Sequence, residues 1–226
     1  MLRRYFVLVS LLLAAGALAA CSAFSSGPTL APAPTAASGG GTLSEGQILL
    51  QFAPSGNEAR YRVREQLANV DLPSDAVGRT AAVSGAIVIN ADGTIASDQS
   101  KVSVDLTGLK SDRSQRDRFL QNNVLQTSTY PTADFVPTGV SGLPSPLPTS
   151  GAVTFQLTGD LTVHGVTKAV TWDVTATAAD GKDLTGTATT SFTFADFGLT
   201  QPRVPVVLSV EDTIKLELDF HLVKGN

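Results

Sequence analysis

The chain contains 226 residues, of which 42% are hydrophobic and 16% charged, and this balance indicates a folded protein with a buried core. Its 16 basic and 20 acidic residues give a net charge of −4, which excludes a nucleic-acid-binding protein that depends on neutralising phosphates. The single cysteine, Cys21, excludes an intramolecular disulfide framework and metal sites built from several cysteines. The 25 threonines favour strands over a helical bundle.

The first 20 residues have the composition of a secretory signal peptide. Arg3 and Arg4 precede an apolar run over residues 5–20, which is shorter than the roughly 20 residues that a membrane-spanning helix needs. The run ends in Leu-Ala-Ala-Cys at Cys21, which resembles the lipobox of bacterial lipoproteins. The resemblance implies cleavage before Cys21 and attachment of a diacylglycerol to its sulfur, so residues 1–20 are predicted to be a lipoprotein signal peptide. An ordinary signal peptide and an uncleaved anchor are the alternatives.

Residues 21–44 are predicted to be the lipidated cysteine followed by a flexible linker. No charged residue occurs over 22–44, and a proline-rich half is followed by Ser-Gly-Gly-Gly, a composition that does not bury a core. The remaining residues, 45–226, are enough for one domain. Loss of Arg3 and Arg4 with the signal peptide would leave 14 basic and 20 acidic residues, a net charge of 14 − 20 = −6, so membrane attachment would depend on the lipid rather than on charge.

Within residues 45–226 the hydrophobic pattern has a period of two, which is typical of strands with one buried face. Turn residues separate several of the strands, at 90–93, 164–165 and 180–181. The pattern predicts eight strands, at 59–64, 83–89, 102–107, 133–135, 153–163, 166–176, 184–194 and 214–222.

One segment departs from this pattern and predicts the single helix. Asp112 is the expected N-cap, and Phe119, Leu120 and Val124 share one helical face. The helix is expected to end before Tyr130 because the following proline disfavours helical geometry there.

The fold class predicted is therefore all-β with one helix, in which about eight antiparallel strands close into a barrel or a sandwich. Such a structure holds either a packed core or one small ligand. The inward rows contain the small residues Gly159, Gly186, Ala176 and Ala188. Aromatic rings in the same rows either line an open interior or interdigitate with the small residues as in an ordinary core, and the spacing does not decide between the two.

Three blocks of sequence resemble the YceI-like family, in the family's order. They are residues 159–168, the segment 116–120 followed by Tyr130-Pro131 and Phe135, and residues 196–199. The resemblance implies a lipocalin-like antiparallel β-barrel over residues 45–226, which holds a polyisoprenoid such as an isoprenoid quinone or a prenyl phosphate in an apolar channel outside the cytoplasm. The residues expected to contact such a ligand are Phe119, Leu120, Tyr130, Phe135, Phe155, Leu157, Trp172, Phe192, Phe194 and Phe197.

The chain departs from the family pattern at two places. Arg118-Phe119 stands where the family often has a histidine, and Phe194-Ala195 stands where it often has a basic residue. A missing cation weakens recognition of a pyrophosphate, which needs charge-assisted hydrogen bonds. A neutral head such as a quinone, or a wholly apolar ligand, is therefore favoured.

The sequence offers little for catalysis. His164 and His221 are its only histidines, and a metal site would require both to converge with a carboxylate such as Asp160. No GxSxG elbow, P-loop or dinucleotide-binding fingerprint is present. We expect no catalytic residues, no metal, and no cofactor other than a bound isoprenoid lipid or quinone. A catalytic interpretation would require His164, Asp160 and Asp196 to meet around a pocket.

The function predicted is that of a membrane-tethered lipoprotein of the cell envelope, extracytoplasmic and lipid-anchored, whose barrel binds, carries or sequesters an isoprenoid-type lipid. Its expected partners are an apolar lipid and the membrane, and no nucleic acid. The alternative is a ligand-free envelope module that binds another protein. Association into a homodimer stays open.

Overall fold

The computed structural model describes residues 43–68 and 70–225. The predicted signal peptide, Cys21 and almost all of the predicted linker lie outside these residues, so the lipoprotein predictions are untested. The described residues form one unit, whose first strand begins at Ile48.

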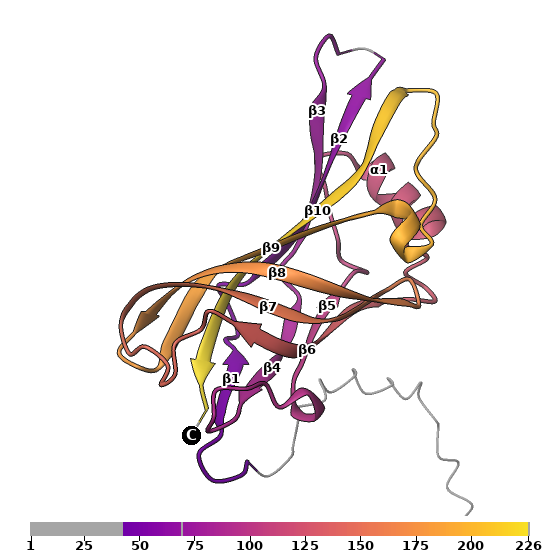
Figure 1. Cartoon of the computed structure of the whole chain (residues 1–226). Coiled ribbons are helices and arrows are strands. Elements are labelled where there is room, and N and C mark those ends of the chain that lie inside the picture. The colour runs from indigo at the N-terminus through magenta and orange to yellow at the C-terminus, as the bar shows by residue number, and fades with distance from the viewer. Residues whose placement is uncertain (1–42, 69, 226) are drawn as a thin grey trace, which may run out of the picture. The chain divides into compact units, whose positions relative to one another are not determined.

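Ten strand segments, one α-helix and three short helical turns make up the fold (Figure 1). The helix α1 spans Ser114–Phe119, and the turns are η1 (Ser97–Gln99), η2 (Leu120–Val124) and η3 (Phe194–Phe197). The strands are β1 (Ile48–Phe52), β2 (Glu58–Leu67), β3 (Ser74–Thr80), β4 (Val83–Ile89), β5 (Lys101–Asp105), β6 (Thr132–Ser141), β7 (Gly151–Val163), β8 (Val166–Ala179), β9 (Asp183–Thr193) and β10 (Val207–Lys224).

The strands close into an eight-stranded antiparallel barrel, which confirms the predicted fold class. Around the barrel the order is β1-β4-β5-β6-β7-β8-β9-β10, and β10 returns to β1 through the pairs Leu50↔Lys224 and Phe52↔Leu222. Closure leaves no free edge in this part of the sheet, which removes the risk of edge-to-edge pairing.

The strands β2 and β3 continue from the barrel into a projecting ribbon. Residues 207–210 of β10 pair with β2 alone, whereas β9 joins β10 only from Thr213 onward. Figure 1 shows β2, β3 and the start of β10 extending away from the other strands, with α1 beside them. The tip of this ribbon carries four exposed aliphatic side chains, Val70, Leu72, Val206 and Leu208.

The alternation that predicts the strands corresponds to inward and outward faces. On β8, Trp172, Val174 and Ala176 are buried, and the intervening Asp173 and Thr175 are exposed. Threonines dominate the outward face because a β-branched side chain suits a pleated surface and its hydroxyl suits water. The buried side chains form one continuous cluster inside the barrel.

The helical segment differs from the prediction at its start. Arg113, not Asp112, is the N-cap residue of α1, and no side chain caps the helix. Asp112 bonds Arg116 instead, while Asp117 accepts hydrogen bonds from the backbone N–H and hydroxyl of Ser111. Both carboxylates are therefore engaged by other groups, and the helix continues through the π-helical turn η2.

Two strands were not predicted, and two predicted strands, 102–107 and 184–194, extend past the ends of the observed strands β5 and β9. The segments β1 and β3 were not predicted, since β1 reads as a short apolar run and β3 carries polar residues among its small ones. The predicted strand 184–194 ends at Thr193, because Thr193 and Asp196 form a capping box that starts η3 at Phe194.

Among the helices that the structure describes, none has the length and apolar composition needed to cross a membrane.

Candidate functional site

The barrel encloses an apolar cavity of about 220 Å³. Aliphatic and aromatic side chains from β1, β2, β4 to β10 and η2 form most of its wall. Three ionisable residues border the cavity: Arg60, Tyr61 and Glu217. A cavity of this composition is suited to a hydrocarbon ligand.

The cavity runs along the barrel rather than lying at one end. On β7 it is lined by residues from Phe155 to Val163. Leu109 and Leu120 line it at the end where α1 lies, and Leu147 of the proline-rich loop lines it at the other end. The shape therefore suits a chain that lies along the barrel axis.

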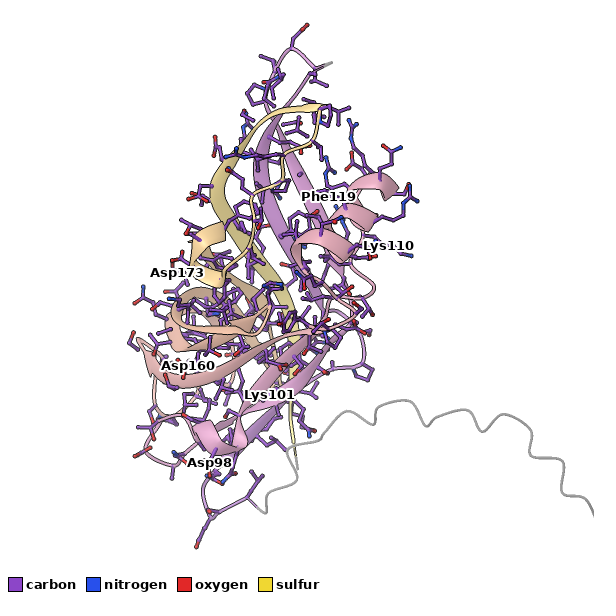
Figure 2. The ribbon with its side chains drawn as sticks, turned by 90° about the vertical axis from the view of Figure 1, so that its right-hand side faces the viewer. Asp98, Lys101, Lys110, Phe119, Asp160 and Asp173 are labelled. Atoms are coloured by element: carbon purple, nitrogen blue, oxygen red, sulfur yellow. The ribbon has the colours of Figure 1, made fainter. Side chains whose placement is uncertain are left out.

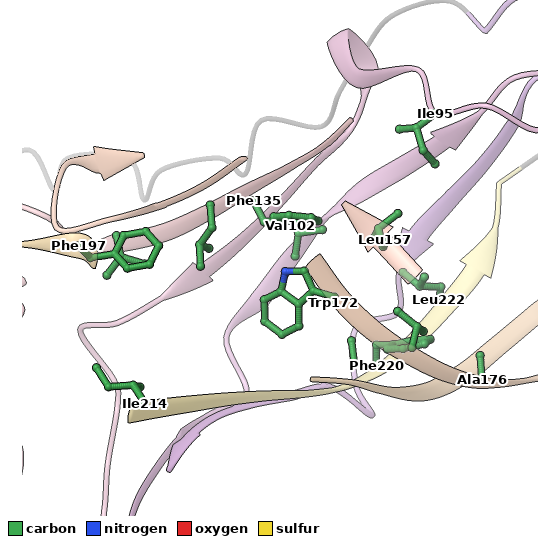
Figure 3. Close-up of a cluster of buried hydrophobic side chains, with 14 of the residues drawn as sticks. Ile95, Val102, Phe135, Leu157, Trp172, Ala176, Phe197, Ile214, Phe220 and Leu222 are labelled. Carbon is green, nitrogen blue, oxygen red and sulfur yellow. The ribbon is translucent and has the colours of Figure 1, made fainter. Parts of the chain in front are cut away.

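Seven of the ten predicted ligand contacts line this cavity. Trp172 lies in the interior of the barrel (Figure 3), and its ring meets Phe135 edge-on at a centroid distance of 6.0 Å. The seven are Leu120, Phe135, Phe155, Leu157, Trp172, Phe192 and Phe194.

The other three predicted contacts lie outside the cavity wall. Phe119 lies on α1 and packs against the core without reaching the cavity (Figure 2). Tyr130 packs edge-on against His164, with ring centroids 4.7 Å apart. Phe197 is fully buried behind Phe192, with centroids 4.4 Å apart. A strand alternates faces strictly, but these three belong to a helix, a loop and a 3-10 turn, where a period of two does not apply.

One of the two interpretations was that the small inward residues leave space for an open interior. The two glycines, Gly159 and Gly186, do not leave such space. A Cβ at Gly159 would lie 2.7 Å from the Phe135 ring, and one at Gly186 would lie 2.8 Å from the Phe220 ring. Each ring thus fills the space above a glycine, as in an ordinary interdigitated core. Ala188 does line the cavity, whereas Ala176, 1% exposed, does not.

Sequence reasoning missed Tyr61 as a cavity residue, although it lies in the predicted strand 59–64. Its ring lies over Gly78 of β3, where a Cβ would come within 2.2 Å of Tyr61 Cε1. The signal was the alternation of Tyr61 and Val63 with arginines, which places both inward. Burial raises the pKa of the Tyr61 phenol well above its usual range.

A buried ion pair lies at the end of the barrel near α1. Glu65, on the same face of β2 as Tyr61 and 7% exposed, pairs with Arg116 of α1. Arg116 also pairs with Asp112. Arg116 therefore joins α1 to β2.

Residues considered for catalysis do not come together. His164 lies in the β7–β8 turn, Asp160 is exposed on β7, and Asp196 caps η3 on the outer surface. None of the three lines the cavity. Over residues 43–68 and 70–225, no group of three or more His, Cys, Asp or Glu side chains is placed to hold a metal.

A second hollow lies on the outside of the barrel over β8, β9 and β10. It is larger, about 630 Å³, but it is open and lined by side chains such as Lys168, Asp173, Thr189 and Lys215. The enclosed apolar cavity is therefore the candidate ligand site.

Comparison with known proteins agrees with this architecture. The model of the YceI-like domain matches residues 51–222, most of the barrel. The chain belongs to the YceI-like family.

The family contains curated relatives of moderate similarity. A UPF0312 protein of Pseudomonas putida (strain GB-1) is 36% identical over 134 residues, which cover 55% of this chain and 63% of the relative. A UPF0312 protein of Pseudomonas savastanoi pv. phaseolicola is 31% identical over 147 residues, which cover 59% of this chain and 70% of the relative. The chain thus spans less than two thirds of the P. putida relative.

Solved structures share the fold of this YceI-like chain at low identity. A polyisoprenoid binding domain from Saccharophagus degradans, implicated in plant cell wall breakdown, has a TM-score of 0.60 at 13% sequence identity. The match covers 80% of this chain and 99% of the S. degradans chain. BcnA of Burkholderia cenocepacia has a TM-score of 0.55 at 16% identity, with coverages of 77% and 99%. These likenesses establish a shared barrel fold.

Proposed function

We propose that the barrel binds the hydrocarbon chain of an isoprenoid-type lipid and carries or sequesters it. The observation that supports this most directly is the cavity inside the barrel, whose wall is almost entirely apolar. Binding would be driven by removal of apolar surface from water, at about 25 cal/mol per Å². The structurally similar polyisoprenoid binding domain from S. degradans supports the same ligand class.

The cavity volume sets how much of a chain fits. At about 220 Å³ it lies below the roughly 300–1,000 Å³ of common small-molecule sites. A segment of a few isoprene units would fill it. A longer chain would extend from an end of the barrel or displace side chains at the ends.

We also propose that the protein is a lipoprotein, tethered through Cys21 to the outer side of a membrane. The support is the apolar run over residues 5–20 that ends in Leu-Ala-Ala-Cys. The uncharged segment that follows would let the barrel stand away from the bilayer surface. A barrel held near a membrane would have direct access to lipid ligands.

A second candidate function is a module that binds another protein without any lipid ligand. The four exposed aliphatic residues at the ribbon tip favour it, because clustered exposed apolar side chains often mark contact surfaces. The enclosed cavity favours the lipid carrier, since a module that only docks through its surface needs no open interior.

Mass spectrometry of co-purified lipid tests the carrier proposal. The full chain is purified in parallel with two variants, Ala188→Phe and Thr185→Phe. Ala188 lines the cavity and Thr185 is exposed on the same strand, so the first ring would fill the cavity and the second would point outward. We expect prenyl lipid with the wild type and Thr185→Phe, and at least a fivefold smaller yield with Ala188→Phe.

Two results would count against the carrier. One is equal lipid recovery from both variants, which would place the lipid outside the cavity. The other is a protein without prenyl lipid that also fails to bind an added prenyl lipid, which would leave the protein-binding module as the better account.

Metabolic labelling tests the anchor. Cells that express the full chain are fed an alkyne-tagged fatty acid, and the wild type is expected to carry the label. Cys21→Ala should lose it, while the outward variant Thr185→Phe should keep it. Label retained by Cys21→Ala would overturn the lipoprotein proposal.

A further inference from the structure

The large hydrophobic side chains that are exposed in residues 43–68 and 70–225 all lie at the tip of the ribbon. Val70 and Leu72 lie between β2 and β3, whereas Val206 and Leu208 lie at the start of β10. Leu72 is 73% exposed and Leu208 is 67% exposed. Figure 1 shows these parts of the three strands at the same end of the molecule. An exposed apolar cluster of this kind usually marks a contact surface.

The backbone of the tip is hydrogen-bonded within the chain. The N–H of Ala68 donates to the C=O of Val206 at 3.0 Å, which joins the two loops. The N–H of Val70 donates to the C=O of Leu67 at 3.3 Å, and the C=O of Val70 accepts a hydrogen bond from the side chain of Gln66. The prolines at positions 73 and 205 have no N–H to leave unpaired. Because lipid chains offer no partner to a backbone polar group, these pairings lower the cost of placing the tip in a bilayer.

The composition and shape of the tip favour a lipid surface over a protein partner. Protein interfaces draw most of their binding energy from Trp, Tyr and Arg, and Leu and Val are under-represented among those residues. The tip instead presents aliphatic side chains on a projection. A protein partner would need a groove of matching shape, whereas lipid chains rearrange around a projection of any outline. Insertion among lipid chains would remove the exposed apolar surface from water.

The charges at the tip indicate which lipid surface it suits. Asp71 is exposed between Val70 and Leu72, so an anionic head group would meet a carboxylate there. Binding to anionic membranes relies on clustered basic side chains, and the segments 70–73 and 203–208 contain one, Arg203. A zwitterionic surface without net charge therefore suits the tip better than an anionic one.

The ribbon also connects the tip to the cavity. Leu67 lies opposite Val207 near the tip, and Val63 lies opposite Ile214 farther along the same two strands. Val63 and Ile214 line the cavity. The carboxylate of Glu65, between the two pairs, is paired with a guanidinium of α1. A bilayer that holds the tip would thus lie at one end of an apolar path into the barrel.

We propose that the ribbon tip inserts its aliphatic side chains into the surface of a phospholipid bilayer without net charge. The contact is made by the ends of β2, β3 and β10, so it is separate from any lipid attached to Cys21. Its purpose rests on the proposed lipid-binding function, because membrane contact would bring the cavity to a source of lipid.

A fluorophore at the tip measures this contact. The full chain carries Cys21→Ser, so that NBD, which brightens in apolar surroundings, attaches only to a cysteine introduced by Leu72→Cys or by the control Thr185→Cys. Thr185 is exposed on β9 and pairs with His221, near the other end of β10. With phosphatidylcholine vesicles, NBD at position 72 is expected to brighten at least threefold and to be quenched by a nitroxide on the lipid chains. NBD at position 185 should not respond, although both proteins share the same N-terminal residues.

Serine substitutions test whether the aliphatic side chains drive insertion. In the chain labelled at position 72, Val206→Ser together with Leu208→Ser should weaken partitioning into the vesicles about tenfold. Thr175→Ser together with Thr177→Ser, at exposed positions of β8, is the control and should leave partitioning unchanged. Equal urea midpoints for all these proteins would show that the variants are folded.

The charge of the vesicles tests the choice of lipid surface. Vesicles of phosphatidylglycerol should take up the tip at least threefold less than vesicles of phosphatidylcholine. Asp71→Asn should remove most of this difference. Tighter binding to phosphatidylglycerol would overturn the preference for a surface without net charge.

Other outcomes would overturn the insertion itself. A chain that sediments with vesicles while NBD at position 72 stays unchanged would bind through other residues, and equal brightening of both labels would indicate non-specific adsorption. Brightening that follows protein concentration without vesicles would assign the tip to contact between copies, and brightening that needs an added envelope protein would assign it to a protein partner. Failure of the proposed lipid-binding function is a separate result, because vesicle contact is measured without any prenyl lipid.

Discussion

Arg60 lies where the charged outer surface of the barrel meets the cavity wall. Its guanidinium contacts Glu58 at 2.9 Å and Glu217 at 3.3 Å, and it also binds Asp219. The hydrogen bond from Arg60 holds the pKa of Asp219 below its usual range. The pKa of Glu217 is also lowered, first by Lys215 and then by Arg60. One side chain therefore ties β2 to β10 through several carboxylates.

This network predicts a stability that depends on pH. A carboxylate whose pKa is lower in the folded state stabilises the fold above its unfolded pKa, and the stabilisation is lost as pH falls through the folded value. The free energy of unfolding should therefore fall between about pH 5 and pH 2. Arg60→Met should cost about 2 kcal/mol at pH 7, and the difference from wild type should shrink at pH 3.

Urea denaturation at the two pH values measures this difference. Arg79→Met is the control, because Arg79 is 60% exposed and lies 3.8 Å from Glu58, so its effect should be small at either pH. A cost of Arg60→Met that is the same at pH 7 and pH 3 would show that the guanidinium acts through packing and not through charge.

Gly159 and Gly186 show what could be predicted from the sequence about single residues and what could not. Gly159 and Gly186 fall on inward rows by simple alternation, and the structure places them there. What fills the space beside them depends on Phe135 and Phe220, which come from other strands. The sequence pattern assigns a face to a residue, but it does not state which ring from a distant strand packs on it.

At the scale of elements, α1 is attached to the barrel by the pair Glu65–Arg116. Removing one partner of a buried ion pair leaves an uncompensated charge, which typically costs about 3–5 kcal/mol, whereas apolar replacement of both is often close to neutral. We expect Arg116→Met and Glu65→Leu each to destabilise strongly. The double variant should lose much less than the sum of the two.

A double-mutant cycle by urea denaturation measures this coupling. Arg118→Met provides the control, since Arg118 is exposed on the same helix, and its loss should change stability by less than about 0.5 kcal/mol. Additive effects of the two single substitutions would contradict the coupling of α1 to β2 through this pair.

The helix was also the element whose details were hardest to predict. Its existence followed from the change of period after residue 109, and its approximate end from the proline at 131. Its N-cap did not follow, because Asp112 is recruited by Arg116, which is itself held by Glu65 on β2. Contacts with a strand about 50 residues away in sequence thus determine the local structure, and no local rule includes them.

For the whole molecule, the barrel was predictable because most of its strands repeat the same alternation, and a closed barrel leaves its strands no free edge. The ribbon was not predictable, since β2 and β10 carry the same pattern inside the barrel and beyond it. Cavity residues on strands were largely identified, as with Phe155 and Leu157 on β7. Whether the interior is open depends on how completely the inward side chains fill the barrel, and the alternation of apolar and polar residues does not give this.

The closure of the barrel also affects how the chain can fold. The pair Leu50↔Lys224 joins residues whose separation is 224 − 50 = 174 positions, and contacts between residues far apart in sequence slow folding. While β10 has not yet been synthesised, β1 is paired only with β4 and β9 only with β8, so each has one unpaired edge. The barrel can therefore close only after β10 has been made. Until then its edges are open to pairing with other chains.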